Sequence, residues 1–212
     1  MIPWFYDFSK FTLWTYFRFG FGLEVRGREH VPARGAFILA ANHVSYFDPP
    51  VLGAACPRRL HFMARASLFR HPLLGAFMRG VGVIPLERGE GDVGALREAV
   101  RRHRRGDVVA IFPEGGRQFS SRLGEARRGV GLLAMTARVP IVPALIQGTF
   151  QALPPHARRP VRAKIRVAFG GPIPYTKPPL PADGTITSAR ERHEALARAV
   201  TQAWRDLARP PT

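Results

Sequence analysis

The sequence predicts an α/β fold, a single domain with a largely parallel or mixed central sheet flanked by helices. Three observations support this class. Strand-like apolar runs alternate along the chain with helix-like segments, which is typical of α/β proteins. Several of the apolar runs lead directly into loops with charged residues, where α/β proteins place their chemistry. With 212 residues, the chain is long enough to bury one sizeable core. It contains no repeat or low-complexity segment that would interrupt this core.

The individual elements follow from composition and periodicity. Short apolar runs predict strands at 23–26, 36–41, 60–64, 82–86, 108–112, 141–147 and 163–169. Apolar residues at helical spacing predict helices at 49–55, 72–79, 93–105, 129–137 and 188–209. The last helix carries an apolar stripe that includes Trp204, so we expect it to pack on the domain. The proline-rich segment 172–183 is expected to be an extended linker that leads to this helix.

Residues 1–22 are predicted to form a helix that associates with a membrane interface, with residues 23–212 as the main domain. Ten of the chain's 22 aromatic residues fall in this first segment. On a helical wheel Asp7, Lys10 and Arg18 occupy an arc of about 80°, and most of the remaining circumference is aromatic, apolar or hydroxylated. This pattern indicates a helix lying in the bilayer interface. A helix that packs on the domain or on a dimer partner is the alternative.

The same segment fits two other membrane roles poorly. It is nearly long enough to span a bilayer, but its three charges and few aliphatic residues argue against a spanning helix. It also lacks the short basic start, the aliphatic stretch and the small-residue cleavage site of a signal peptide. An interfacial helix therefore remains the prediction.

The most informative motif follows the apolar segment 36–40 and sets His43 and Asp48 five residues apart. A histidine removes a proton from a hydroxyl best when a carboxylate fixes its tautomer and stabilises the imidazolium that forms. Asp48 before Pro49 also fits a helix N-cap and N1 pair, which would place His43 on a strand-to-helix loop. The motif predicts a general base with its orienting carboxylate. Capping and turn residues beside an incidental histidine are the alternative.

Two further apolar runs end in charged residues. Residues 108–112 lead into a Pro-Glu-Gly-Gly-Arg sequence that contains Glu114 and ends at Arg117. The glycine pair would let backbone N–H groups turn toward an anion, and the planar guanidinium of Arg117 suits phosphate oxygens. An ordinary glycine-rich turn with a surface ion pair between Glu114 and Arg117 is the alternative. The apolar run 81–86 ends similarly at Arg88, where a merely solvated arginine is the alternative.

These residues resemble the glycerolipid acyltransferase superfamily, and most closely the 1-acylglycerol-3-phosphate (lysophosphatidic acid) acyltransferases. The resemblance extends over roughly residues 36–148, and four motifs in the family's order are far rarer by chance than any one of them. The four are Asn42-His43 with Asp48, similar to NHxxxxD; Val83 to Arg88; Phe112 to Arg117, similar to FPEGTR; and the proline-bracketed strand Val139 to Ala144.

The resemblance implies an enzyme that moves a fatty acyl group from an acyl thioester to the free hydroxyl of a lysophospholipid, most directly 1-acylglycerol 3-phosphate, giving phosphatidic acid. It implies His43 as general base and Asp48 as the carboxylate that orients it, without a covalent acyl-enzyme. Cys56 has no neighbouring base, and Ser45 lies in no nucleophile-elbow motif. The resemblance further implies substrate-binding roles for Asn42, Arg88, Glu114, Gly115, Arg117 and Arg128.

Metal and cofactors are not expected, because the histidines form no close ligand pair and a single cysteine cannot build a thiolate cage. Arg128 belongs to an Arg-Arg-Gly element that also suits a solvated helix start. Gly116 stands where the family usually has threonine and Gln118 where it usually has serine, so one hydroxyl donor to the acceptor phosphate is missing. This leaves a different acceptor open, such as a lyso-aminolipid. A noncatalytic protein that binds anionic lipid on the same scaffold is a further alternative.

The formal net charge of +17 predicts an anionic partner. An anionic membrane surface, a phosphate substrate and an acidic acyl carrier protein all fit. Nucleic acid is not expected, because the sequence has no zinc finger, basic heptad helix or aromatic sheet motif. Acyl carrier protein and coenzyme A thioesters both stay open as acyl donors, as does the oligomeric state. With a single cysteine, these features predict a peripheral or monotopic protein on the cytoplasmic face of the cell membrane.

Overall fold

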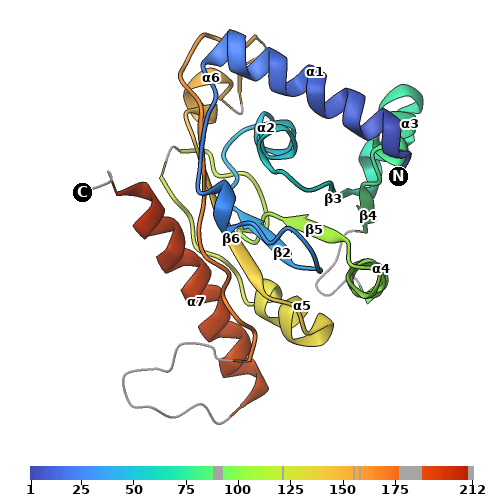
Figure 1. Cartoon of the computed structure of the whole chain (residues 1–212), viewed down its shortest axis with the longest axis vertical. Coiled ribbons are helices and arrows are strands. Elements are labelled where there is room, and N and C mark those ends of the chain that lie inside the picture. Colours follow the sequence, from blue (N-terminus) through green and yellow to red (C-terminus); the bar gives the residue numbers. More distant parts are fainter. Residues whose placement is uncertain (88–92, 121, 155, 158, 177–187, 210–212) are drawn as a thin grey trace.

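The computed structural model describes residues 1–87, 93–120, 122–154, 156–157, 159–176 and 188–209. In this part of the chain a seven-stranded sheet lies between two layers of helices (Figure 1). The strand order is β1-β7-β6-β2-β5-β3-β4. The strands are β1 (Glu24–Arg26), β2 (Ile38–Ala41), β3 (Leu60–Arg65), β4 (Ile84–Leu86), β5 (Val108–Ile111), β6 (Ile141–Gln147) and β7 (Arg166–Phe169).

Neighbouring strands run parallel at every step of the sheet except one. The central strand β2 is parallel to both its neighbours, with Ile38 opposite Val109 of β5 and opposite Ile141 of β6. β7 pairs antiparallel with β6, and β1 pairs parallel with β7. The sheet is therefore mixed but mostly parallel, which confirms the predicted fold class.

Helices on both faces of the sheet explain why its strands are continuous apolar runs in the sequence. All four residues of β2 are buried. Leu39 belongs to the core formed with α1, α2 and α6, and Ile38 to the core formed with α4, α5 and α7. The helices are α1 (Pro3–Phe21), α2 (Asp48–Ala55), α3 (Pro72–Gly80), α4 (Val93–Arg104), α5 (Gly129–Ala137), α6 (Thr149–Ala152) and α7 (Ala189–Ala208), and the 3-10 turns are η1 (Arg28–His30) and η2 (Ala66–Arg70).

The predicted elements are all present, with a few shifted boundaries. β7 begins at Arg166 instead of residue 163, because the Ile165 N–H donates to the Phe21 carbonyl oxygen and not to a neighbouring strand. α7 begins after Ser188, which forms a capping box with Glu191. α6, η1 and η2 were not predicted, since segments this short show no periodicity. Of the predicted linker, residues 177–183 lie outside the described residues.

One face of α1 packs on the domain, as the alternative interpretation of this segment expected. Phe17 and Phe21 are buried in the core beneath it. The Tyr6 hydroxyl accepts a hydrogen bond from the Leu60 N–H at 2.9 Å, and burial raises the pKa of this hydroxyl. The Lys10 ammonium donates to the Cys56 carbonyl oxygen at 2.6 Å. Among the described helices, none combines the length and apolarity of a membrane span.

Candidate active site

Two loops from neighbouring parallel strands meet at one edge of the sheet. β2 leads into the loop with His43, and β5 leads into the loop with Glu114 and Arg117. The Gln118 N–H donates to the His43 carbonyl oxygen at 2.9 Å, and the His43 N–H donates to Glu114 Oε2 at 3.4 Å. Because carboxyl ends of parallel strands lie at the same edge, motifs far apart in the sequence form one site.

The His43 ring contacts the Asp48 carboxylate directly. Nδ1 of His43 lies 2.8 Å from Oδ2 of Asp48, and the same oxygen accepts the N–H groups of Val44 at 2.6 Å and Ser45 at 2.7 Å. The Asp48 side chain is fully buried, whereas 17% of the His43 side chain is exposed. Since an ionised carboxylate only accepts hydrogen bonds, this contact assigns the proton to Nδ1 and leaves the Nε2 lone pair free. The pair is arranged as a general base with its orienting carboxylate.

Asp48 does not cap α2, so the expected N-cap and N1 pair is wrong by one residue. The helix begins at Asp48 itself, and Phe47 occupies the N-cap position without a side-chain cap. The reason is that the carboxylate turns back toward the preceding loop, where it binds the His43 ring and two backbone N–H groups. Pro49 follows within the first turn, where its missing N–H costs no hydrogen bond.

Aromatic packing fixes the plane of the His43 ring. The ring stacks on Phe112, with centroids 4.3 Å apart and planes 24° apart. Phe112 in turn lies beside Phe62, at 6.3 Å and 13°. The sequence placed Phe112 at the end of a strand and at the start of the motif similar to FPEGTR, but it predicted no contact with His43, because an aromatic residue in an apolar run is normally core. The stack makes Phe112 part of the site and sets the direction in which Nε2 points.

Asn42 and Ser45 are committed to the backbone around the site. The Asn42 amide donates to the Ile146 carbonyl oxygen at 3.0 Å and accepts the Ile146 N–H at 2.7 Å, which ties the end of β2 to β6. The Ser45 hydroxyl donates to the Leu153 carbonyl oxygen at 2.7 Å. Cys56 lies just past the far end of α2, where burial raises its pKa to about 11. Neither Ser45 nor Cys56 is placed as a nucleophile, and substrate binding by Asn42 stays a prediction.

Arg117 is held next to the loop with His43 by Tyr46. Its guanidinium carbon lies 3.5 Å from the centroid of the Tyr46 ring, and Nη2 donates to the Tyr46 hydroxyl at 2.9 Å. Nη1 is buried and finds no hydrogen-bond partner among the described residues. Glu114 bonds to the His43 backbone, and no ion pair joins it to Arg117, although both residues are described. The surface ion pair considered for these two residues is therefore absent. Tyr46 was missed because an exposed aromatic side chain has no sequence pattern.

Gly115 is required by its conformation and its neighbour. Its φ is +81°, and a Cβ atom here would lie 2.8 Å from the guanidinium carbon of Arg127. The Gly115 N–H donates to the Phe112 carbonyl oxygen at 3.3 Å, so it closes the turn instead of facing an anion. Arg127 thus lies against this loop. Its neighbour Arg128 is exposed and lies near His193 of α7, whose pKa is lowered by burial and then by the charge of Arg128. Arg88 lies outside the described residues.

Glu114 is a buried carboxyl group with a raised pKa. It is 2% exposed, and burial is the main cause that raises its pKa to about 7. Hydrogen bonds from the His43 N–H, the Gln118 side chain and the Gly124 backbone lower this pKa only in part, and the nearby Asp48 charge raises it. Glu114 therefore gains or loses its proton near neutral pH, whereas a glutamate on the surface is ionised there. The sequence motif gave no sign of this raised pKa.

The raised pKa of Glu114 makes the stability of the protein depend on pH. The folded-state pKa of about 7 lies above the ordinary value of 4.5. The stabilisation that this group gives the folded state is therefore fully present below pH 4.5 and is lost as the pH rises through 7. Glu114→Gln removes the ionisation, so its melting temperature relative to wild type should rise between pH 5 and pH 8 by ~2–4 °C or more. Thermal unfolding across this range tests it. The exposed Glu29→Gln is the control, and an equal pH trend in both variants would contradict the assignment.

α7 supports the site from the face of the sheet opposite to α2. The Trp204 indole N–H donates to the Ala40 carbonyl oxygen of β2 at 3.1 Å. The Thr201 hydroxyl accepts the Ala126 N–H at 2.9 Å, which anchors the segment that follows the Glu114–Arg117 loop. The predicted packing helix therefore also positions both strand-to-loop segments of the site.

The fold and the site together define a class of protein. A mostly parallel α/β sheet that carries, at its carboxyl edge, a partly exposed histidine bonded to a buried aspartate and an arginine on the neighbouring loop is an enzyme scaffold suited to proton abstraction beside an anionic group. The family model described as Acyltransferase matches residues 22–147, more than half of the chain. The chain belongs to this acyltransferase family.

Within the family, the similarity is to proteins named 1-acyl-sn-glycerol-3-phosphate acyltransferases. The Bacillus subtilis protein is 26% identical, with 88% of each chain covered. The human alpha protein is 29% identical over 84% of this chain, which spans 64% of that protein's length. The crystal structure of the 1-acyl-sn-glycerophosphate acyltransferase PlsC from Thermotoga maritima has the same fold, with a TM-score of 0.76 at 24% identity over 99% of this chain and 81% of that one. The resemblance recognised from the four motifs is confirmed.

Proposed function

We propose that this acyltransferase moves a fatty acyl group from an acyl thioester to the free hydroxyl of 1-acylglycerol 3-phosphate, giving phosphatidic acid. The observation that carries the proposal is the 2.8 Å contact between His43 Nδ1 and Asp48 Oδ2, which leaves Nε2 as the basic atom; Arg117 contacts Tyr46, on the same loop as His43. The names of the similar proteins support the same acceptor.

The reaction proceeds without an acyl-enzyme. Nε2 of His43 takes the proton of the acceptor hydroxyl, while Asp48 keeps the Nδ1 proton in place and stabilises the imidazolium. The acceptor oxygen attacks the thioester carbonyl carbon and forms the new C–O bond. Collapse of the tetrahedral intermediate breaks the C–S bond, and the imidazolium returns its proton to the departing thiolate. The Ser45 hydroxyl, which donates to the Leu153 carbonyl oxygen, and the Cys56 thiol beyond the end of α2 do not act as nucleophiles.

The acceptor phosphate is bound by basic side chains of the loop that follows β5, which contains Glu114 and Arg117. Arg117 presents a buried Nη1 that no described residue bonds, and a guanidinium binds two phosphate oxygens with a planar fork. Arg127 lies against the same loop beside Gly115. A Cβ atom at Gly116 would meet no atom within 4 Å, so space is open where the family usually carries a threonine hydroxyl. The alternative to 1-acylglycerol 3-phosphate is an acceptor with a larger or differently charged headgroup, such as a lyso-aminolipid.

Replacing Arg117 by lysine should weaken acceptor binding more than catalysis. A lysine keeps the charge but loses the fork and the stacking on Tyr46, so the KM for 1-acylglycerol 3-phosphate should rise about tenfold with a much smaller change in kcat. Steady-state kinetics with varied acceptor measure this. Arg122→Lys, an exposed residue of the same loop, is the matched control. A fall in kcat at unchanged KM would argue against phosphate binding by Arg117.

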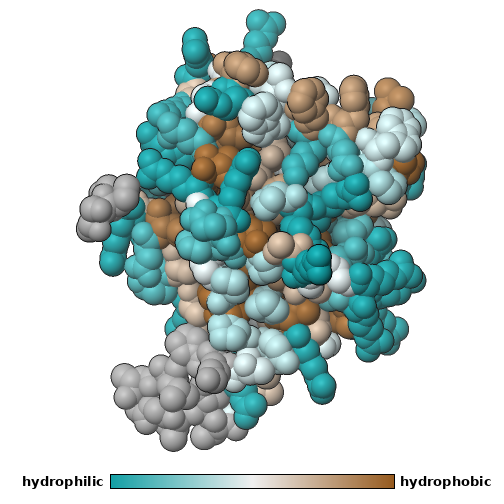
Figure 2. Space-filling model, in the orientation of Figure 1, coloured by the Kyte–Doolittle hydropathy of each residue, from teal (hydrophilic) through white to brown (hydrophobic). Residues whose placement is uncertain are grey.

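The outer face of α1 supports peripheral attachment to a membrane, on the cytoplasmic side where acyl thioesters occur. At 100° per residue, Trp4, Phe8, Phe11 and Phe19 lie within about 80° of one another, opposite the face that packs on the domain. Each of these rings is at least 64% exposed. Figure 2 shows apolar side chains along the edge of the molecule formed by α1 and α3, and the rings of Phe5 and Phe77 join the two helices at 5.7 Å.

Polar substitutions on this face should abolish membrane attachment without unfolding the protein. Phe8→Ser, Phe11→Ser and Phe19→Ser combined remove three of the four exposed rings, so cosedimentation with vesicles that contain about one fifth phosphatidylglycerol should fall at least tenfold. Val93→Ser with Leu132→Ser replaces exposed apolar residues of α4 and α5, across the sheet, and should have no effect. Attachment that survives the triple variant would contradict the proposal.

Turnover decides the function. The purified protein is incubated with 1-acylglycerol 3-phosphate and either acyl carrier protein or coenzyme A thioesters, and phosphatidic acid is followed by mass spectrometry. Product with one donor supports the proposal and identifies that donor. Product only with another lysolipid would replace the acceptor, and lipid binding without product from any acceptor would favour the noncatalytic lipid-binding alternative.

A further inference from the structure

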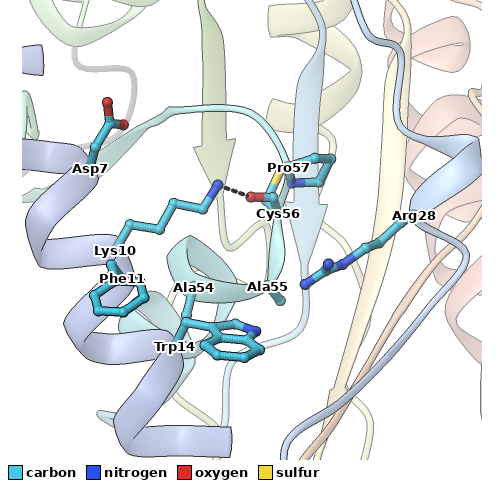
Figure 3. A pocket seen from close by; sticks show the side chains of 9 residues that line it. All are labelled: Asp7, Lys10, Phe11, Trp14, Arg28, Ala54, Ala55, Cys56 and Pro57. Carbon is cyan, nitrogen blue, oxygen red and sulfur yellow. Dashed lines mark hydrogen bonds between the residues drawn. The ribbon is translucent and has the colours of Figure 1, made fainter.

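A second candidate binding site lies away from His43. A cavity of about 300 Å³ opens between α1, the C-terminal end of α2 and η1, lined by residues that include Lys10, Trp14, Arg28 and Cys56 (Figure 3). α2 separates this cavity from the site described above, because Asp48 begins the helix and Cys56 follows its end. Eight helical residues span about 12 Å. We propose that the cavity binds the phosphate of an anionic phospholipid of the membrane on which the protein lies.

The cavity carries two positive charges that the described part of the protein does not neutralise. Lys10 donates one hydrogen bond, to the Cys56 carbonyl oxygen at 2.6 Å, and an ammonium group has two further N–H donors. Arg28 points its guanidinium toward the same space, and the described residues offer that group no hydrogen bond or ion pair. Burial lowers the pKa of Lys10, and the charge of Arg28 lowers it further. A bound phosphate would relieve both effects.

The other polar groups at the cavity leave these charges uncompensated. Asp7 is paired with Arg59 through two hydrogen bonds, at 2.9 and 2.6 Å, so its charge is already balanced. The Cys56 thiol is neutral at physiological pH, because burial raises its pKa to about 11. The lining is therefore cationic, which suits an anion with several acceptor oxygens.

The rest of the lining is apolar and favours a lipid over free phosphate. The indole of Trp14 forms one wall, and Phe11, which is 67% exposed, forms the rim. Phe11 also belongs to the exposed aromatic face of α1, so a phosphate in the cavity would have its glycerol and acyl chains beside the rings proposed to lie in the membrane. Tryptophan at headgroup level is the normal arrangement at a bilayer interface. Such a lipid would fix the depth of α1 in the interface, whether or not the protein is active.

The tryptophans provide a local test, because the chain contains only Trp4, Trp14 and Trp204. Their indole N–H resonances are assigned by single Trp→Phe substitutions and followed while dihexanoyl phosphatidylglycerol is added below its micelle concentration. Dihexanoyl phosphatidylcholine and inorganic phosphate are titrated in parallel. Phosphatidylglycerol is neither substrate nor product of the proposed reaction, so the result does not depend on turnover. We expect a saturable shift of the Trp14 signal with phosphatidylglycerol, little with the other two, and none for the buried Trp204.

Variants then test the charges. Arg28→Gln alone removes a guanidinium that makes no hydrogen bond or ion pair with the described residues, and should weaken the affinity for phosphatidylglycerol at least fivefold. Adding Lys10→Gln should abolish saturable binding. Arg192→Gln with Arg198→Gln makes the same change in net charge on exposed positions of α7, and should leave the titration unchanged. An unsaturable Trp14 shift, an equal response to phosphatidylcholine, or saturation that survives loss of both charges would overturn the site. Saturation by inorganic phosphate alone, at the same affinity, would overturn its assignment to a lipid.

Discussion

His43→Ala should lower kcat by at least about a hundredfold while the protein stays folded. The ring bonds to the buried Asp48 carboxylate on one side and is accessible on the other, with 17% of the side chain exposed. Without it, the acceptor hydroxyl must lose its proton to water. The KM for the acceptor should change little, because the residues proposed to bind its phosphate lie on the other loop.

The measurement is initial rate with the donor identified by the turnover assay, together with thermal unfolding. His156→Ala, an exposed histidine outside the site, is the matched control and should keep wild-type turnover. Loss of stacking on Phe112 is a separate effect of the substitution. His43→Phe retains an aromatic ring without a base, so it should be as inactive as His43→Ala. Turnover within a few-fold of wild type in either variant would remove His43 from the mechanism.

Asp48→Asn should lower kcat on the order of a thousandfold with a small change in KM. The amide keeps the size of the carboxylate but loses its charge, so it neither stabilises the imidazolium nor fixes the proton on Nδ1. It should also cost about 1–3 kcal/mol of unfolding free energy, because Oδ2 accepts the Val44 and Ser45 N–H groups as well as the ring.

A spectroscopic measurement separates orientation from simple loss of structure. The ¹⁵N resonances of the His43 ring report which nitrogen carries the proton, and wild type should show the Nδ1–H tautomer that the Asp48 contact requires. The variant should show a mixture, while its unfolding remains cooperative. Asp206→Asn, near the exposed end of α7, should affect neither reading. An unchanged tautomer together with a large loss of kcat would mean that Asp48 acts otherwise than by orienting His43.

The local features of the fold were predictable because they depend on residues close together in the sequence. The buried strand β2 appears as a continuous apolar run, since helices cover both its faces. α7 begins where Ser188 precedes Glu191 by three residues, the spacing of a capping box. The pairing of His43 with Asp48 also spans only five residues, from the loop after β2 to the first residue of α2, and its spacing suggested the contact that the structure contains.

Contacts between distant segments were not predictable in the same way. The sequence indicated that α1 is aromatic on most of its surface, but only packing shows that Phe17 and Phe21 are buried while Phe8 and Phe19 are exposed. In the Arg-Arg-Gly element, adjacent arginines point to different surroundings, with Arg127 against the Gly115 turn. Neighbouring residues on a turn diverge in direction, so composition alone cannot choose between them.

By itself the sequence determined the order of strands and helices, the acyltransferase motifs and the pairing of a base with a carboxylate, because periodicity, turn chemistry and short spacings act locally. The tertiary structure decided which of these side chains meet. It placed Phe112 against the His43 ring, Tyr46 beneath Arg117, and Lys10 beside Arg28 in a cavity at the other end of α2. It also buried Glu114, which raises its pKa to about 7. Each of these depends on how parallel strands align their loops and how helices cover them, and that is set by packing of the whole chain.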